Sequence, residues 1–345
     1  MTTIAVVGGG PAGCALAVTA ARCGHEVVVY DEGRRLRSWP GESLPAGAGE
    51  LVASVFGPEV LEGHAKAFGT AAAWGSAELV SHDYMSHWSG HGWHLGRAVF
   101  DDAVRAVAVG LGVRLEHRRI TSPDEMSADW IVDASGRAGV IVSRLGVPRV
   151  RLDDQVALVG VVADRGGERV TTVEAVRDGW WYTTPLPNGT RVAALVTDSH
   201  RASRRSDLWL ESLATTVHVA DLTGDVRRVE VSAYPADTTY RLDVVGDGWL
   251  AVGDAAACFD PLSSQGLLTG IVMGARAGAL LGGDLTGWAE DYRAIVDEHI
   301  ALRSDYLRAE DRWPAAPFWQ RRRAALVEGT DDVLVPVDER AGHHA

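Results

Sequence analysis

A glycine-rich turn between a strand and a helix is the feature that most constrains the fold of this chain. Residues 4–7 form a short apolar, β-branched run, and the sequence Gly-Gly-Gly-Pro-Ala-Gly follows it directly at positions 8–13. An alanine-rich helical pattern comes next, and then a second strand pattern that ends at Asp31. This spacing is typical of the first βαβ unit of a dinucleotide-binding fold, in which the helix N-terminus faces the phosphates.

The positions of the turn have separate expected roles in binding a dinucleotide. Gly8 allows the tight turn, Gly10 lets the backbone approach a pyrophosphate, and Gly13 lets the helix pack closely on the strand. Ala12 belongs to the same turn. Asp31 is expected to accept hydrogen bonds from the ribose of the adenosine.

Two aspartates at the ends of later strand patterns indicate which dinucleotide binds. Asp133 precedes a Ser-Gly turn that includes Gly136, and Asp254 follows a second apolar run. An acid at a strand end, next to a helix start, is well placed to hydrogen-bond a ribityl chain, which FAD has and NAD lacks. Turn aspartates are common on their own. The two together, in this order behind the glycine turn, favour FAD.

Composition favours an enzyme of the cytoplasm that binds neither nucleic acid nor membrane. The 345 residues carry a net charge of −13, which opposes nucleic-acid binding. No apolar run approaches the length of a membrane span. The three cysteines lack metal-ligand spacing, so we expect a reducing compartment, no disulfide framework and no metal site.

The secondary-structure patterns predict a mixed α/β fold in which one domain interrupts the other. A Rossmann-type FAD-binding domain is expected to comprise residues 1–70, 97–150 and 235–287. An antiparallel-sheet substrate domain is expected to comprise residues 71–96 and 151–234, since successive strand patterns there are separated by turn residues. Residues 288–345 are predicted to form C-terminal helices and a tail.

Further motifs along the chain resemble one family. They are Gly41-Glu42-Ser43-Leu44-Pro45, Trp74-Gly75-Ser76, Gly92-Trp93-His94-Leu95, Gly179-Trp180-Trp181-Tyr182 with Pro185-Leu186-Pro187, Asp260-Pro261 to Gly266, and Glu310 with Arg312-Trp313-Pro314. With the three signatures above, they resemble the superfamily of aromatic hydroxylases and flavin-dependent halogenases. The resemblance is strongest to the flavoprotein maturases that oxidise a tryptophan side chain while tryptophylquinone cofactors form in amine dehydrogenases and amino-acid oxidases.

The resemblance implies an FAD-dependent monooxygenase that hydroxylates an electron-rich aromatic ring through a flavin hydroperoxide. The implied substrate is the indole of a tryptophan in a peptide or protein, in quinone-cofactor maturation or natural-product biosynthesis. O2 is the implied co-substrate. Electrons are expected from NAD(P)H or from a separate flavin reductase, because the chain has no second glycine fingerprint for a nicotinamide cofactor.

Residues near the flavin ring are expected to come from three other segments. The helix pattern that begins near Leu267 follows Pro261 and Gly266, and N–H groups at its start can stabilise negative charge on the reduced flavin. Ser43 follows the second strand closely enough to pass beside the ring. Arg97 resembles the family position that steadies the cofactor.

Candidate catalytic groups are Glu42, His91 and His94. Glu42 could hydrogen-bond a ring edge or act as a base, and either histidine could remove a proton from the substrate ring. A surface acid and two structurally satisfied histidines are the alternatives.

Trp180, Trp181 and Tyr182 are expected to lie on one strand near the substrate. Side chains alternate along a strand, so Trp181 faces away from its two neighbours. We expect Trp180 and Tyr182 to face the substrate pocket and Trp181 to pack in a core.

A flavin-dependent tryptophan or aryl halogenase is the nearest alternative. Such enzymes resemble this chain but use a lysine beside a tunnel, and the single lysine here, Lys66, lies in a segment predicted to be helical. Tyr182 also departs from the Trp-x-Trp-x-x-Pro pattern of those relatives. A second alternative is a flavin-stabilised module that binds a precursor peptide without oxygenating it.

Overall fold

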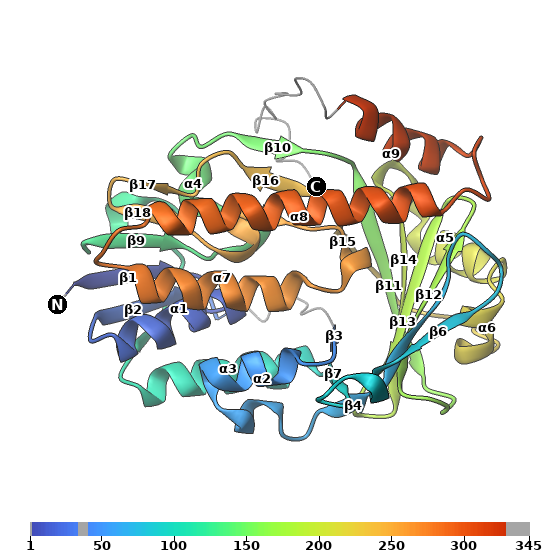
Figure 1. The fold of residues 1–345 in the computed structure, drawn as a ribbon, viewed down its shortest axis with the longest axis horizontal. Helices are drawn as coiled ribbons and strands as arrows, with labels where there is room; N and C mark the ends of the chain where they lie inside the picture. Colours follow the sequence, from blue (N-terminus) through green and yellow to red (C-terminus); the bar gives the residue numbers. More distant parts are fainter. Residues whose placement is uncertain (1, 34–40, 329–345) are drawn as a thin grey trace.

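A six-stranded sheet with helices packed on it forms the first half of the molecule (Figure 1). The computed structural model describes residues 2–33 and 41–328. The strand order is β17-β18-β9-β1-β2-β8, and all neighbours are parallel except β17 and β18. The strands are β1 (Thr3–Val7), β2 (Glu26–Asp31), β8 (Arg114–His117), β9 (Trp130–Asp133), β17 (Val245–Gly246) and β18 (Trp249–Ala251). This arrangement confirms the expected Rossmann-type α/β fold.

Small residues let two helices of this half pack closely together. The helices of this half are α1 (Pro11–Arg22), α2 (Ala48–Phe56), α3 (Arg97–Gly110), α4 (Val140–Arg144) and α7 (Gly266–Leu280). A Cβ on Gly274 of α7 would collide with the carbonyl oxygen of Ala12 in α1. The glycines and alanines of both helices therefore serve close packing as well as the turn.

A seven-stranded sheet forms the second half, in the order β15-β11-β14-β13-β12-β5-β6. Its strands are β5 (Gly69–Ala73), β6 (Val80–Asp83), β11 (Gln155–Ala163), β12 (Val170–Val176), β13 (Gly179–Pro185), β14 (Thr190–Asp198) and β15 (Val231–Pro235). Every pairing is antiparallel except that of β12 with β5. Two short helices, α5 (Arg205–Leu213) and α6 (His218–Thr223), follow β14.

Two small three-stranded sheets join the halves. One contains β3 (Glu42–Leu44), β7 (Gly92–Leu95) and β4 (Ala65–Ala67), and the other contains β10 (Arg149–Arg151), β16 (Thr239–Arg241) and β19 (Ala257–Cys258). Lys66 therefore lies on a strand, and the predicted helix there is wrong. The segment pairs with β7 and so takes an extended conformation. Short 3-10 turns lie at Pro58–Leu61, Tyr84–Ser86, Pro123–Glu125, Gly136–Ala138, Ser199–Arg204, Gly253–Ala255 and Pro261–Ser263.

The long helix α8 (Thr286–Ala309) runs across both halves of the molecule (Figure 1). Its Trp288, Tyr292 and Val296 belong to the core of the first half, and its Leu307 belongs to a core on the seven-stranded sheet. Helix α9 (Pro317–Glu328) follows and buries Trp319 against the same sheet. In the described part of the chain, no helix combines the length and the apolar character that crossing a bilayer demands.

Candidate functional site

A cavity of about 700 Å³ lies where the first half of the molecule meets the seven-stranded sheet. This volume is within the usual range for small-molecule and cofactor sites. Eleven of the residues expected from the sequence line it: Gly8, Gly10, Ala12, Asp31, Glu42, Arg97, Gly136, Asp254, Pro261, Gly266 and Leu267. These residues lie up to 259 positions apart in the sequence, and the fold brings them together around one cavity.

The glycine turn after β1 has the geometry of an anion site. Gly8 has a φ of +111°, in the region that favours glycine, and a Cβ on Gly13 would collide with the carbonyl oxygen of Gly8. A Cβ on Gly10 would meet nothing and would project into open space at the cavity. Helix α1 begins without a side-chain cap, so N–H groups of its first turn remain available to phosphate oxygens.

The carboxylate of Asp31 holds the turn and faces the cavity. It accepts hydrogen bonds from the N–H groups of Gly9 and Gly33, both at 2.8 Å. Arg105 of α3, which the sequence reasoning missed, donates from Nε to the carbonyl of Gly9 (2.8 Å) and also lines the cavity. Arg97, Asp101 and Arg105 are spaced four residues apart, so they share one face of α3. That spacing is the sequence pattern from which a role for Arg105 at the cavity could have been predicted.

Glu42 and Arg97 form a half-buried ion pair at the cavity wall. Nη1 of Arg97 lies 3.1 Å from a carboxylate oxygen of Glu42, and Nε of Arg97 donates to Asp101 (3.1 Å). Burial raises the pKa of Glu42, and the guanidinium of Arg97 opposes that rise. Glu42 is thus placed to accept a hydrogen bond or a proton in the cavity.

Asp133 and Asp254, both expected beside the cofactor, have different environments. The side chain of Asp254 is 48% exposed at the cavity, with Arg137 3.9 Å away. Asp133 is fully buried and lies outside the cavity lining. Its carboxylate accepts hydrogen bonds from the N–H and hydroxyl of Ser135 and from two N–H groups at the start of α4. Those four bonds occupy the carboxylate in this structure, where it holds the start of α4, and the expected contact with the sugar chain stays a prediction.

Ser43 and His94 make hydrogen bonds inside the protein and do not line the cavity, so their expected roles stay predictions. The hydroxyl of Ser43 bonds the hydroxyls of Thr171 (2.8 Å) and Thr184 (3.2 Å) inside the protein. His94 is fully buried, and its Nδ1 donates to the carbonyl of Pro185 (3.0 Å). Burial lowers the pKa of His94 to about 4, so the ring is neutral near pH 7.

His91 lies in the loop before β7, away from the cavity lining. Its Nδ1 donates to the carbonyl of Gly92 (3.2 Å), and its ring contacts the ring of Trp93 edge-on. Of the three candidate bases, the structure therefore brings only Glu42 to the cavity.

The three aromatic residues of β13 face opposite sides of the sheet, as expected. Trp181 packs edge-on against Trp209 of α5, at 5.0 Å between ring centroids. Trp180 and Tyr182 belong to the hydrophobic core on the other face. Ala157 and Ala236 of the same core line the cavity, so this face is the one next to it. Burial, and after it the negative charge of Glu42, raises the pKa of Tyr182.

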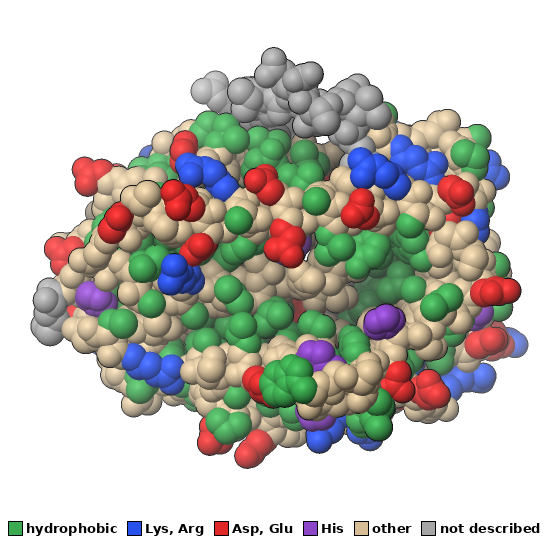
Figure 2. All heavy atoms as spheres, in the orientation of Figure 1, with side chains coloured by type: hydrophobic (Ala, Val, Ile, Leu, Met, Phe, Trp, Pro, Cys, Tyr) green, Lys and Arg blue, Asp and Glu red, His purple; other side chains and the backbone are tan. Residues whose placement is uncertain are grey.

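Both residues on that face are buried. Trp180 is 2% exposed, and Trp74 packs edge-on against it at 6.4 Å. Neither Trp180 nor Tyr182 lines the 700 Å³ cavity. Below the C-terminal part of α8 the molecular surface is hollowed, and hydrophobic side chains wall the hollow (Figure 2).

The fold and the cavity define a flavin-dependent oxidoreductase with an FAD-binding Rossmann domain. A glycine turn after the first strand, an acid after the second and an exposed acid after β18 surround one cavity, and the residues present fit a dinucleotide with a sugar-alcohol chain.

Comparison with known families agrees with this class. The model of the family described as tryptophan halogenase matches residues 78–277, more than half of the chain, and a model of the NAD(P)-binding Rossmann-like domain matches residues 6–40. The chain belongs to the tryptophan halogenase family.

Individual relatives differ in their named activities. The putative FAD-dependent oxidoreductase LodB of Marinomonas mediterranea is 28% identical over 92% of this chain and 96% of its own length. A menaquinone reductase of Mycobacterium tuberculosis is 29% identical over 81% of this chain and 76% of its own length.

Solved structures share the fold. The peptidyl tryptophan dihydroxylase QhpG superimposes with a TM-score of 0.77 at 24% identity, covering 93% of this chain and 78% of that one. The flavin-dependent halogenase CmlS gives a TM-score of 0.82 at 20% identity, covering 95% and 70%.

Proposed function

We propose that this protein is an FAD-dependent monooxygenase that hydroxylates the indole of a tryptophan within a peptide or protein. The observation that carries the choice of hydroxylation is the position of the single lysine. Lys66 is exposed on β4 and does not line the cavity, so this chain offers no lysine to handle a halogenating species there.

The cavity wall carries groups suited to each part of the cofactor. The α1 turn and Asp31 suit the pyrophosphate and the adenosine ribose, and Asp254 suits the ribityl chain. Glu42, Arg97 and Pro261 line the same cavity, and we assign them to the flavin ring. When bound, FAD supplies the electrons that activate O2 for attack on an aromatic ring.

The chain's own contribution to the reaction is to position the ring, exclude water and accept a proton. The aromatic face of β13 lies beside the cavity, and Trp180 and Tyr182, which are buried there, are the residues that we assign to contact with the indole. Glu42, whose pKa is raised by burial, is the base that we assign to this site.

A protein or peptide substrate is supported by one relative. QhpG, named for dihydroxylation of a peptidyl tryptophan, shares the fold of this chain. LodB, which matches nearly the full length of this chain, supports the FAD-dependent oxidoreductase class. We extend the peptidyl substrate to this chain and propose O2 as co-substrate. The electrons come from NAD(P)H bound transiently or from a separate flavin reductase, and the protein acts in the cytoplasm.

Halogenation is the second candidate, because the matching family model is that of tryptophan halogenases. Both candidates are tested by giving the FAD-loaded protein a tryptophan-containing peptide, ¹⁸O2, a flavin reductase with NADH, and bromide. We expect mass spectrometry to show peptide that has gained ¹⁸O and no bromine. Brominated peptide would favour the halogenase, and unmodified peptide bound without turnover would favour a binding module.

A further inference from the structure

A buried arginine on α8 connects two segments that line the cavity, although α8 itself does not reach it. Arg303 is 6% exposed and lies in the C-terminal third of the helix. Its Nε donates to Asp260 (3.3 Å) and its Nη2 donates to Asp153 (2.8 Å). None of the described residues from Thr286 onward lines the cavity.

Asp260 connects Arg303 to the turn that lines the cavity. One oxygen of its carboxylate accepts from the N–H of Leu262 (3.0 Å) and thereby fixes the turn that contains Pro261. The other oxygen accepts from Nε2 of Gln155 (3.0 Å) as well as from Arg303. Asp260 and Pro261 both line the cavity.

Asp153 links the second contact to the segment that follows β15. Its other oxygen accepts from the N–H of Thr238 (3.3 Å), two residues after Ala236. Pro235 and Ala236 line the cavity from the seven-stranded sheet. Arg303 is therefore bonded to two acids, and each acid supports a segment that lines the cavity.

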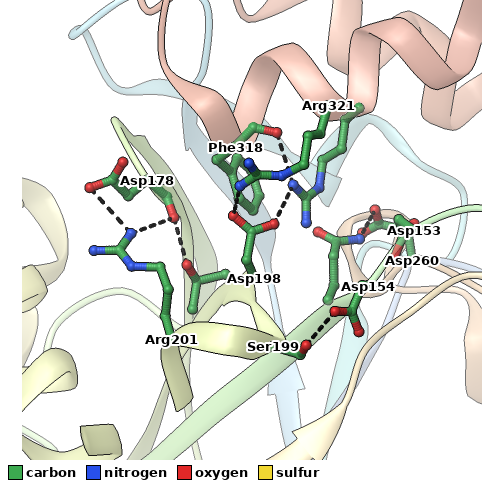
Figure 3. A network of polar contacts seen from close by, with 12 residues as sticks. Asp153, Asp154, Asp178, Asp198, Ser199, Arg201, Asp260, Phe318 and Arg321 are labelled. Carbon is green, nitrogen blue, oxygen red and sulfur yellow. Dashed lines mark hydrogen bonds and ion pairs between the residues drawn. The ribbon is translucent and has the colours of Figure 1, made fainter. Parts of the chain in front are cut away.

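The two ends of α8 are anchored in different cores. Trp288 and Tyr292 pack in the core of the first half, and Leu307 packs in the core on the sheet. Beyond α8, helix α9 is held by Asp198, which pairs with Arg321 and with Arg322 at 3.0 Å. Figure 3 shows Asp153 and Asp260 side by side in the network that also contains Asp198 and Arg321.

We propose that Arg303 is a positioning residue that fixes the separation of the two cavity walls, and so the affinity and environment of the bound flavin. A guanidinium can bond two carboxylates in fixed directions, which an ammonium does less well. Removal of Arg303 would take away the guanidinium that bonds both Asp153 and Asp260. The two buried carboxylates would then repel each other, and the cavity-lining segments that they support would shift. This inference rests on FAD binding and not on the choice between hydroxylation and halogenation.

The test compares Arg303→Met and Arg303→Lys with Arg308→Met as the matched control. Arg308 lies on the same helix but is exposed, and its side chain pairs with Asp305 at the surface. The measurements are the Kd for FAD by flavin fluorescence, the visible absorption band of bound flavin, and the unfolding midpoint of the FAD-free protein. Titrations are made well below that midpoint.

We expect Arg303→Met to raise the Kd for FAD about tenfold or more and to shift the flavin band, in line with the loss of contacts that orient ligand-binding groups. Arg303→Lys should fall between Arg303→Met and the parent, and Arg308→Met should match the parent. If Arg303→Met does not fold, Arg303→Lys decides: a raised Kd at an unchanged midpoint supports the proposal. A Kd and flavin band equal to the parent in the folded Arg303 variants would overturn it, even if their midpoints fall.

Discussion

The cavity wall and the sheet face beside it are built in different ways. The wall is open and exposes backbone and charged groups: a glycine turn without side chains, an uncapped helix start and an aspartate whose side chain is 48% exposed. The sheet face is closed and aromatic, with Trp180 2% exposed. A wall of this kind can take a dinucleotide without opening, whereas the aromatic face is closed by its own packing, so a substrate ring could contact Trp180 only after that packing moves.

The largest expected effect is the difference in stability between the Asp133 and Asp254 variants. Asp133→Ala should lower the free energy of unfolding by about 3–5 kcal/mol, because four buried donors lose a charged acceptor. Asp254→Ala should leave stability nearly unchanged and weaken FAD binding by about 1.5–3 kcal/mol. Urea unfolding and FAD titration of both variants measure this. Equal loss of FAD affinity, with equal stability, would restore Asp133 as a cofactor contact.

The next effect tests the two faces of β13. Trp180→Leu should misplace the substrate ring and slow product formation about a hundredfold, with more hydrogen peroxide released per NADH consumed. Trp181→Leu should keep product and NADH consumption coupled but lower the free energy of unfolding by about 1–3 kcal/mol. Trp180 is itself buried, so its replacement should also cost stability. Full coupling in both variants would remove this strand from the active site.

A smaller effect depends on pH and on His94. Its pKa is about 4 in the folded protein, against about 6.5 when unfolded. The unfolded chain therefore binds more protons between these values, and stability falls as pH falls through that window. Between pH 7 and pH 5 this residue should account for about 2 kcal/mol of the loss.

The variant His94→Asn, which keeps a donor for the carbonyl of Pro185, should lack that part of the pH dependence. Urea unfolding at both pH values measures it, with the exposed His82→Asn as the matched surface control. An unchanged difference between pH 7 and pH 5 in His94→Asn would mean that His94 is not the buried neutral group described here.

The smallest expected effect is at Lys66. Lys66→Ala should change product formation and stability by no more than about 0.5 kcal/mol, because the side chain is exposed and does not line the cavity. Steady-state rates with the peptide substrate check this. Loss of activity in this variant would revive the lysine-dependent alternative.

The cofactor wall could largely be predicted from the sequence because its contacts are local. Gly8, Gly10 and Gly13 act through backbone geometry that a short spacing encodes, and Asp31 ends the next strand. Asp133 shows the limit of that reasoning. A strand-end aspartate can equally bond N–H groups of its own chain, and only the course of the following residues decides between the two roles.

The sheet face and the supporting residues could not be predicted in the same way. Trp180 packs against Trp74, which in turn packs against Trp319, and no local pattern encodes contacts between such distant segments. Arg303 reaches Asp153 across 150 positions. Such contacts depend on how the two halves assemble around α8.

The most direct test of this account is a crystal structure of the protein with FAD and a tryptophan-containing peptide. We expect the pyrophosphate against the turn from Gly8 to Gly13, and Asp254 within hydrogen-bonding distance of the ribityl chain. The flavin ring should lie near Glu42 and Pro261, with the indole facing Trp180. A dinucleotide bound outside this cavity, or its sugar chain held by Asp133, would contradict the account.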